Sequence, residues 1–301
     1  MSQAESVRPQ VRIGTKIVGE GHPCYVIAEI GINHNGDIVL AKRLIGIASA
    51  AGCDAVKFQK RTPEICVPAT QRDVLRETPW GILTYMEYRK KIEFGQEEYA
   101  RIDACCREAG LQWFASCWDD DSIDFMEQFD LPCYKVASAT LTDLSLLRKL
   151  RGIGKPVILS TGMSTLEEID EAVEVLGTTN LILLHSVSSY PAYYEELNLR
   201  VIPALRERYK VPVGYSGHET GLPSTVAAVV LGACVIERHI TTDRALWGTD
   251  QAASLEPNGI ARLVRDIRLV ETSLGDEIKR VTPRELTIRE KLRCSKVHAA
   301  S

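Results

Sequence analysis

The sequence predicts an α/β protein with the (β/α)8, or TIM-barrel, fold. Three observations lead to this prediction: eight short apolar runs, amphipathic segments that alternate with them, and a length of 301 residues. A barrel of this kind typically needs about 250 residues. Regular alternation of strands and helices is typical of a parallel sheet whose strands are connected by helices. The chain is therefore long enough for one barrel and a short remainder.

Each apolar run has the length of a strand buried on both faces. In chain order the predicted strands are 25–30, 55–59, 112–116, 133–137, 156–160, 181–186, 211–216 and 234–239. The segments with apolar residues at helical spacing are 38–51, 96–109, 122–129, 144–150, 166–176, 199–209, 221–231 and 260–274. Residues 25–280 are accordingly assigned to the barrel.

The remaining residues form two ends and one long loop. Residues 1–24 are an N-terminal extension in which 11–18 is expected to cap the base of the barrel, and residues 281–301 are a C-terminal tail that resembles a linker. The loop 61–94 after the second strand is enlarged. Long loops at the C-terminal face of a barrel usually belong to the active site.

Composition indicates a globular enzyme without nucleic-acid or membrane partners. Hydrophobic residues make up 45% and charged residues 25%, with a net charge of −4, close to globular averages. Basic residues of 279–296 are interspersed with acidic ones, as on a solvated surface. The longest apolar run, 226–236, is shorter than the roughly 20 residues of a membrane span. The nine cysteines contain no Cys-x-x-Cys pair, and the polar start has no signal-peptide core, so we expect reduced thiols in a cytoplasm.

Two histidines follow neighbouring predicted strands. His218 comes just after the strand 211–216 and His239 ends the strand 234–239, with a single helix between them. Because parallel neighbours bring their C-terminal ends to one rim, both imidazoles should lie close together. Imidazole combined with oxygen ligands suits manganese, iron or zinc. The pair therefore predicts a catalytic divalent metal.

Polar residues at other strand ends predict an anion site beside this pair. Lys57 and Lys135 lie inside strongly apolar segments, and Ser160-Thr161-Gly162 precedes a predicted helix. Ammonium groups, hydroxyls and backbone donors together suit a phosphate or carboxylate. His185, at the end of the sixth strand, is compatible with either a ligand contact or a hydrogen-bonded interior residue. Further polar strand-end residues are Glu29, Gln59, Ser216 and Glu237.

Long motifs resemble those of the sialic acid synthases over about residues 13–295. They read IAEIGINHNG (27–36), DAVKFQ (54–59), LSTGM (159–163), GYSGH (214–218) and ERH (237–239). The resemblance implies condensation of phosphoenolpyruvate with the open-chain aldehyde of N-acetylmannosamine, a related hexosamine or its 6-phosphate. The products are a nine-carbon 2-keto-3-deoxy sugar acid and phosphate. It also implies Mn²⁺, or Mg²⁺ or a similar ion, and a homo-oligomer such as a dimer.

The resemblance also implies roles for individual residues. The implied metal ligands are His218 and His239. The implied contacts with phosphoenolpyruvate are Lys57, Lys135, Ser138, Thr161, Gly162 and Ser216. Ser160 and His185 are included as further predicted substrate-binding residues. The implied acceptor contacts are Glu29, Gln59, Ser188, Tyr190 and Asp250. Many family members have asparagine where this chain has Ser188, so a different substituent at C-2 of the sugar is compatible with the pocket.

A second departure from the family concerns the C-terminus. Family members commonly add an antifreeze-like domain, whereas this sequence ends at Ser301 where 289–295 resembles the start of the linker.

The residues are also compatible with other functions. Octulosonate-phosphate and heptulosonate-phosphate synthases share the substrate phosphoenolpyruvate, but the stretch 31–36 favours the sialic acid type. A pyruvate lyase with a Schiff base on Lys57 or Lys135 would need no metal. A catalytically silent sugar-binding paralogue would not need the full set of polar residues.

Overall fold

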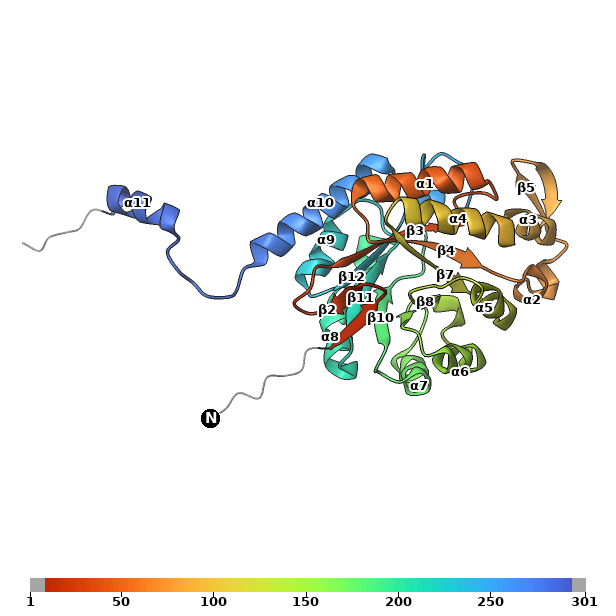
Figure 1. Ribbon diagram of the computed structural model, residues 1–301, viewed down its shortest axis with the longest axis horizontal. Coiled ribbons are helices and arrows are strands. Elements are labelled where there is room, and N and C mark those ends of the chain that lie inside the picture. Colours follow the sequence, from red (N-terminus) through yellow and green to blue (C-terminus); the bar gives the residue numbers. More distant parts are fainter. Residues whose placement is uncertain (1–8, 294–301) are drawn as a thin grey trace, which may run out of the picture.

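The computed structural model describes residues 9–293 and confirms the predicted barrel. Eight parallel strands close in the order β10-β11-β12-β3-β4-β7-β8-β9 (Figure 1). The strands are β3 (Tyr25–Gly31), β4 (Ala55–Lys60), β7 (Gln112–Cys117), β8 (Tyr134–Val136), β9 (Val157–Ser160), β10 (Leu181–Ser186), β11 (Val213–Gly217) and β12 (Val235–His239). Each predicted run becomes a strand, with ends that shift by at most two residues.

Helices connect the strands and cover the outside of the barrel. They are α1 (Ile38–Ala51), α4 (Gln96–Glu108), α5 (Asp120–Met126), α6 (Leu144–Ile153), α7 (Leu166–Leu176), α8 (Val201–Tyr209), α9 (Pro223–Val230) and α10 (Pro257–Leu274). Local sequence explains where they begin and end. The Asp37 side chain accepts a hydrogen bond from Val39 N at the start of α1, and Gly52 ends it with a left-handed φ of 78°. An acceptor at the first turn and a glycine beyond the last turn satisfy the free backbone groups of a helix.

A small hairpin covers the base of the barrel. Strands β1 (Gln10–Ile13) and β2 (Lys16–Gly19) pair antiparallel, and Val11, Ile13 and Val18 are buried. The Gln112 side chain donates a hydrogen bond to Ile13 O (3.2 Å) and accepts one from Tyr25 Oη (2.5 Å). Because Gln112 and Tyr25 begin β7 and β3, the hairpin lies at the N-terminal ends of the strands, opposite the face where function is expected.

The enlarged loop after β4 has structure of its own. It contains α2 (Pro63–Cys66), the antiparallel hairpin β5 (Leu75–Thr78) with β6 (Gly81–Thr84), and α3 (Tyr85–Ile92). In Figure 1 it lies at the opposite end of the barrel from β2. Rings of Trp80 and Tyr88 pack edge-on against Trp247, from the loop after β12, at centroid distances of 6.4 and 5.0 Å. Aromatic contacts of this kind hold the loop over the C-terminal face.

The motif 31–36 connects loops at the C-terminal face of the barrel. Asn33 Nδ2 donates hydrogen bonds to Ile240 O (2.9 Å) and Ser254 Oγ (2.8 Å), and Asn35 Nδ2 donates to Trp247 O (2.9 Å). His34 stacks on Phe94 at a centroid distance of 4.0 Å. Burial lowers the pKa of His34 to about 3, so its ring is neutral. These polar side chains tie the loop after β3 to the loops after β4 and β12.

The C-terminal part of the chain leaves the barrel. Helix α10 packs against α1 and α9, whereas α11 (Pro283–Leu292) has no buried residue and lies apart from the barrel in Figure 1. Residues 294–301 of the predicted tail lie outside the described residues. In the described chain, the cysteines are free and no helix has the length and apolarity to span a bilayer.

Candidate functional site

A cavity of about 200 Å³ opens at the C-terminal end of the barrel. Side chains from the ends of the strands line it, which is the usual place of an active site in this fold. The lining contains most of the predicted site residues, namely Glu29, Lys57, Gln59, Lys135, Ser138, Ser160, Ser188, Tyr190, Ser216, His218 and His239. It also contains Ser116, Trp118, Met163 and Glu237, which were not in the predicted set.

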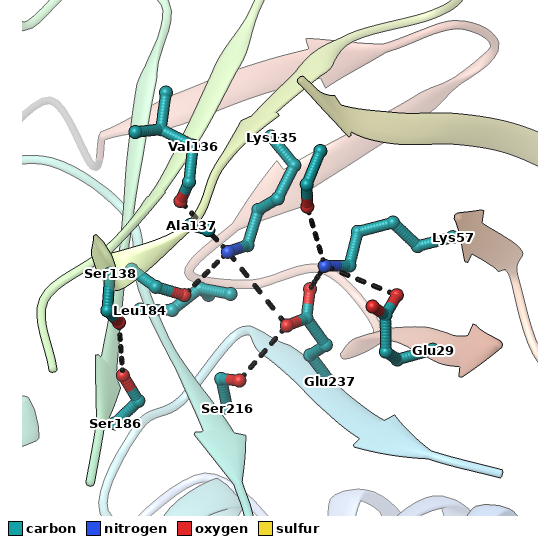
Figure 2. A network of polar contacts seen from close by, with 12 residues as sticks. Glu29, Lys57, Lys135, Val136, Ala137, Ser138, Leu184, Ser186, Ser216 and Glu237 are labelled. Atoms are coloured by element: carbon teal, nitrogen blue, oxygen red, sulfur yellow. Dashed lines mark hydrogen bonds and ion pairs between the residues drawn. The ribbon is translucent and has the colours of Figure 1, made fainter. Parts of the chain in front are cut away.

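Two lysines and two glutamates form a buried ionic network on the cavity floor (Figure 2). Lys57 Nζ lies 3.2 Å from Glu29 Oε2 and 3.4 Å from Glu237 Oε2, and Lys135 Nζ lies 3.9 Å from Glu237 Oε1. Each lysine also donates a hydrogen bond to a serine, Lys57 to Ser116 (2.9 Å) and Lys135 to Ser160 (2.6 Å). Glu237 is therefore the shared counter-ion of both ammonium groups.

Position along the chain could have identified Glu237. It lies two residues before His239 on β12, and residues two apart on a strand point to the same face. In the barrel this face is the interior, and Ser216 donates a hydrogen bond to Glu237 Oε1 (3.0 Å). Sequence reasoning placed Glu237 on the correct face but assigned it no role, because its pairing with lysines on β4 and β8 depends on closure of the barrel.

Mutual pairing sets the charge of these groups. Burial would raise the pKa of Glu237, but Lys135 and Lys57 outweigh it and bring that pKa to about 2. Burial likewise opposes the charge on Lys57, yet Glu237 and Glu29 raise its pKa above the ordinary value. Burial lowers the pKa of Lys135 to about 8 despite Glu237, and burial raises the pKa of Glu29 despite Lys57. Glu29 is thus the more readily protonated of the two carboxylates.

The predicted histidine pair meets at the wall of the cavity. The rings of His218 and His239 have centroids 5.6 Å apart, and Tyr190 packs on His218 at 4.1 Å. His218 Nδ1 donates to Val187 O (2.6 Å), which leaves Nε2 with a free lone pair. Burial and the neighbouring His239 lower the pKa of His218 to about 4, so the ring is neutral at pH 7. His239 Nδ1 is buried without a hydrogen-bond partner and lies 3.7 Å from Asp250 Oδ2.

A ring of serines surrounds the backbone at Gly162. Gly162 N donates to Ser138 Oγ (3.0 Å) and Ser186 Oγ (3.1 Å), and these two hydroxyls lie 3.2 Å apart. A Cβ atom at position 162 would lie 2.3 Å from Ser188 Oγ. Only glycine therefore lets the backbone come this close to the hydroxyls. The prediction from sequence did not include Ser186 or Ser116.

Comparison with known proteins decides the family. The sequence matches the NeuB family over residues 44–279. The chain belongs to the NeuB family. It is 40% identical over 280 residues to N-acetylneuraminate-9-phosphate synthase from Mus musculus, covering 91% of this chain and 78% of the relative. It is 36% identical over 271 residues to N,N'-diacetyllegionaminic acid synthase from Campylobacter jejuni, covering 86% and 80%. NeuB relatives of this kind are sialic acid-type synthases, so the chain is an enzyme of that class.

Solved structures agree with this assignment. The N-acetylneuraminic acid synthetase of Leptospira borgpetersenii superposes with a TM-score of 0.84 at 31% sequence identity, covering 95% of this chain and 98% of that chain. A truncated 3-deoxy-D-arabino-heptulosonate 7-phosphate synthase from Thermotoga maritima superposes with a TM-score of 0.69 at 17% identity. At that identity, the likeness shows the shared barrel alone.

Four of the predicted NeuB site residues, Thr161, Gly162, His185 and Asp250, are not among those lining the cavity. Thr161 Oγ1 donates to Leu184 O (3.1 Å) and His185 Nε2 donates to Leu197 O (2.7 Å). Both side chains instead line a separate cavity of about 620 Å³ beside α7 and α8. Consecutive strand residues point to opposite faces, so Ser160 faces inward while Thr161 faces outward. The side chains of Thr161 and His185 thus lie outside the central cavity, and His185 has the hydrogen bond expected of an interior residue. Asp250 lies beside His239.

Proposed function

We propose that this chain condenses phosphoenolpyruvate with an N-acetylmannosamine-like hexosamine or its 6-phosphate. The products are a sialic acid-type nine-carbon 2-keto-3-deoxy sugar acid and inorganic phosphate. The observation that carries the proposal is one cavity in which two buried lysines lie beside a pair of histidines. The lysines suit an anionic substrate, and the histidines suit an ion that activates a carbonyl.

Phosphoenolpyruvate is assigned to the lysine side of the cavity. Lys57 and Lys135 would exchange part of their contact with Glu237 for the carboxylate and phosphate of the substrate. The hydroxyls of Ser138 and Ser216 line the same cavity and offer further donors. Glu237 keeps the lysines paired before the substrate arrives, since an unpaired buried charge is costly.

A divalent metal, for which we propose Mn²⁺, is assigned to His218 and His239. The residues fit such an ion, because His218 is neutral and its Nδ1 carries the proton of the hydrogen bond to Val187 O. Its Nε2 is therefore unprotonated and free to bind a metal. A hydrogen bond from the second ring nitrogen is the usual support of a histidine ligand. In the described chain no group of three or more His, Cys, Asp and Glu side chains is arranged for a metal. Water or substrate oxygens would complete the set, and the bound ion would polarise the acceptor aldehyde.

Glu29 and Gln59 are assigned to the acceptor. Glu29 pairs in register with His239 on the neighbouring strand, and Gln59 Nε2 donates to Glu29 Oε1 (3.1 Å). In the reaction C3 of phosphoenolpyruvate forms a bond to the aldehyde carbon, whose oxygen takes a proton. Water adds at C2 and phosphate then leaves by cleavage of its C–O bond. Glu29, with its raised pKa, is placed to provide or relay the proton.

The range of acceptors follows the names of the relatives. The mouse relative is named for a 9-phosphate product, whereas the Campylobacter relative is named for N,N'-diacetyllegionaminic acid. Both kinds of hexosamine acceptor are therefore within the proposal. The short side chain of Ser188 in the cavity also leaves room for a different C-2 substituent.

Phosphate release tests the proposal. Phosphoenolpyruvate and Mn²⁺ would be supplied with N-acetylmannosamine, its 6-phosphate, mannose 6-phosphate or arabinose 5-phosphate, each with and without a chelator. We expect metal-dependent release with a hexosamine acceptor. Release with arabinose 5-phosphate alone would favour the octulosonate-phosphate type. Borohydride trapping of pyruvate without metal would replace the proposal by Schiff-base chemistry.

The cellular compartment and the oligomeric state are part of the same proposal. We place the enzyme in the cytoplasm, where phosphoenolpyruvate is made, and as a homo-oligomer. A sizing measurement that returns a monomer at micromolar concentration would reject the oligomer.

A further inference from the structure

A second cavity, of about 160 Å³, lies beside the first under the loop that follows β4. Its lining includes Arg61, Tyr85, Arg89, Glu93 and Trp118. Trp118 also lines the central cavity, so the indole is a common wall of both. The two spaces are also joined through Gln59, because Arg61 Nη2 donates to Gln59 Oε1 and Gln59 lines the central cavity.

Three buried donors around this second cavity have no hydrogen-bond partner. They are Arg61 Nε, Arg89 Nη1 and Trp118 Nε1. Arg61 is 7% exposed, and its guanidinium stacks on the Trp118 ring at 3.6 Å from the centroid. Buried polar groups in folded proteins nearly always have a partner, and each exception needs an explanation. Three exceptions in one cavity point to a ligand that accepts hydrogen bonds.

The charges around the cavity favour an anion. Arg61 and Arg89 face it, and after burial the positive charge of Arg89 is the main cause that lowers the pKa of Arg61, to about 10. Arg61 therefore remains cationic at neutral pH. The nearby carboxylate of Glu93 is already engaged, since its Oε2 lies 3.6 Å from Lys60 Nζ and accepts from Arg61 N (3.2 Å).

A second nearby carboxylate is also engaged. Asp119 accepts hydrogen bonds from Thr62 N (2.7 Å) and Ser122 N (2.7 Å). Counted with Lys60, which is paired with Glu93, the two arginines exceed the two carboxylates by one positive charge. Paired guanidinium groups bind phosphate with a geometry that a single ammonium group does not provide.

We propose that the Arg61–Arg89 cavity binds the phosphate of a phosphorylated acceptor sugar. This inference rests on the proposed function and selects the hexosamine 6-phosphate from the two acceptors it allows. A continuous row of contacts leads from His239 through its neighbour Glu29 to Gln59 and on to Arg61. An open-chain hexose 6-phosphate carries its aldehyde at one end and its phosphate at the other. It can therefore lie along this row with the aldehyde at the histidines and the phosphate at the arginines.

Acceptor selectivity of an Arg89→Gln variant tests this inference. The measured quantity is kcat/KM for N-acetylmannosamine 6-phosphate divided by kcat/KM for N-acetylmannosamine, at saturating phosphoenolpyruvate. Wild type should favour the phosphorylated sugar, and Arg89→Gln should lower the ratio by roughly 10- to 100-fold, the usual effect of losing a charge-assisted hydrogen bond. Arg89→Lys, which keeps the charge, should recover part of the ratio.

Lys90→Gln is the matched control. It removes a positive charge from the next residue of the same helix, where Lys90 is paired with Glu64 on the exposed surface (2.6 Å). Its ratio should equal that of wild type, and an equal loss in both variants would overturn the phosphate site by pointing to general electrostatics.

Other outcomes separate this inference from the proposed function. Efficient turnover of the free sugar with no preference for its 6-phosphate would overturn the phosphate site and leave the proposed function standing. A rise in KM for phosphoenolpyruvate in Arg89→Gln, with the acceptor ratio unchanged, would assign the arginines to the other substrate and also overturn it. Absence of turnover with either acceptor would overturn the proposed function, and the inference with it.

Discussion

At the scale of single residues, the cavity floor balances charge before any substrate binds. Lys57 and Lys135 are 4% and 2% exposed, too deep to be charged without partners. Glu237 provides the partner for both, and the serines complete their hydrogen bonds. The arrangement avoids the cost of isolated buried ions and keeps donors aimed into the cavity. Under the proposed function, the carboxylate or phosphate of phosphoenolpyruvate would replace Glu237 as an acceptor for these donors.

The pKa of Lys135 predicts the alkaline limit of activity. With a pKa of about 8, Lys135 is protonated below that pH and loses its charge above it. We expect kcat/KM for phosphoenolpyruvate to fall above pH 8, approaching about tenfold per pH unit, because this constant reports the free enzyme. Lys135→Met should lower activity below pH 8 and abolish the decline of kcat/KM above pH 8. A decline that persists unchanged in the variant would show that another group causes it.

Glu29→Gln tests the proton step of the proposed reaction. Glutamine keeps the size of the side chain and can still accept from Gln59, but it cannot exchange a proton. We expect kcat to fall by roughly 100-fold or more, within the usual range for a general acid or base, with little change in KM for the acceptor. Steady-state kinetics with varied acceptor gives both constants. Unchanged kcat would remove Glu29 from proton transfer.

At the scale of elements, close strand packing positions the histidines. On β11, a Cβ atom at Gly214 would lie 2.4 Å from Val235 O and 2.6 Å from a Leu184 methyl group. Behind the strand ends, the buried pair Arg238–Glu219 (3.3 Å) joins β12 to the turn after β11, and Tyr215 and Thr225 donate to the same carboxylate. Glu219 follows His218 and Arg238 precedes His239, so this pair fixes both imidazoles from behind.

A pair of glycine substitutions tests this packing. Gly214→Ala should force β10, β11 and β12 apart and lower the free energy of unfolding by about 1–3 kcal/mol, as overpacking commonly does. Gly46→Ala, in the interior of α1, meets no atom within 4 Å. It should raise the free energy of unfolding by about 0.5–1 kcal/mol. Urea unfolding measures both. Equal effects of the two substitutions would contradict the close contact at β11.

At the scale of the whole molecule, α10 and α11 have different relations to the barrel. Helix α10 buries Ile260, Leu263, Val264 and Ile267 against the neighbouring elements, whereas every described residue of α11 is exposed. Burial of an apolar face provides most of the stability of a helix in a protein. Unfolding of the barrel should therefore depend on α10 and be nearly independent of α11.

The same substitution in both helices checks this difference. Leu263 is fully buried, while Leu286 is 49% exposed. Leu263→Ala should lower the free energy of unfolding by about 2–5 kcal/mol, through lost burial and the cavity that remains. Leu286→Ala should change it by less than about 0.5 kcal/mol. Thermal or urea unfolding of both variants decides, and similar losses would show that α11 is buried against a partner surface in solution.

The barrel and the histidine pair could be predicted because their signals are local. Strands buried on both faces appear as continuous apolar runs, and helices appear as apolar residues at a helical period. His218 and His239 end consecutive parallel strands, so topology alone brings them to one rim. Lys57 and Lys135 could be selected for the same reason, as single charges within apolar strands.

The remaining features of the site depend on tertiary structure. Only strand register shows that Ser160 faces the cavity while Thr161 and His185 face away. Only barrel closure brings Glu237 of β12 to Lys57 of β4 and Lys135 of β8. Only the folded loop places Arg61 and Arg89 in one cavity with Trp118. Sequence determined which chemical groups stand at the strand ends, because that pattern is periodic and local. Tertiary structure decided which of them meet, because those contacts join residues far apart in the chain.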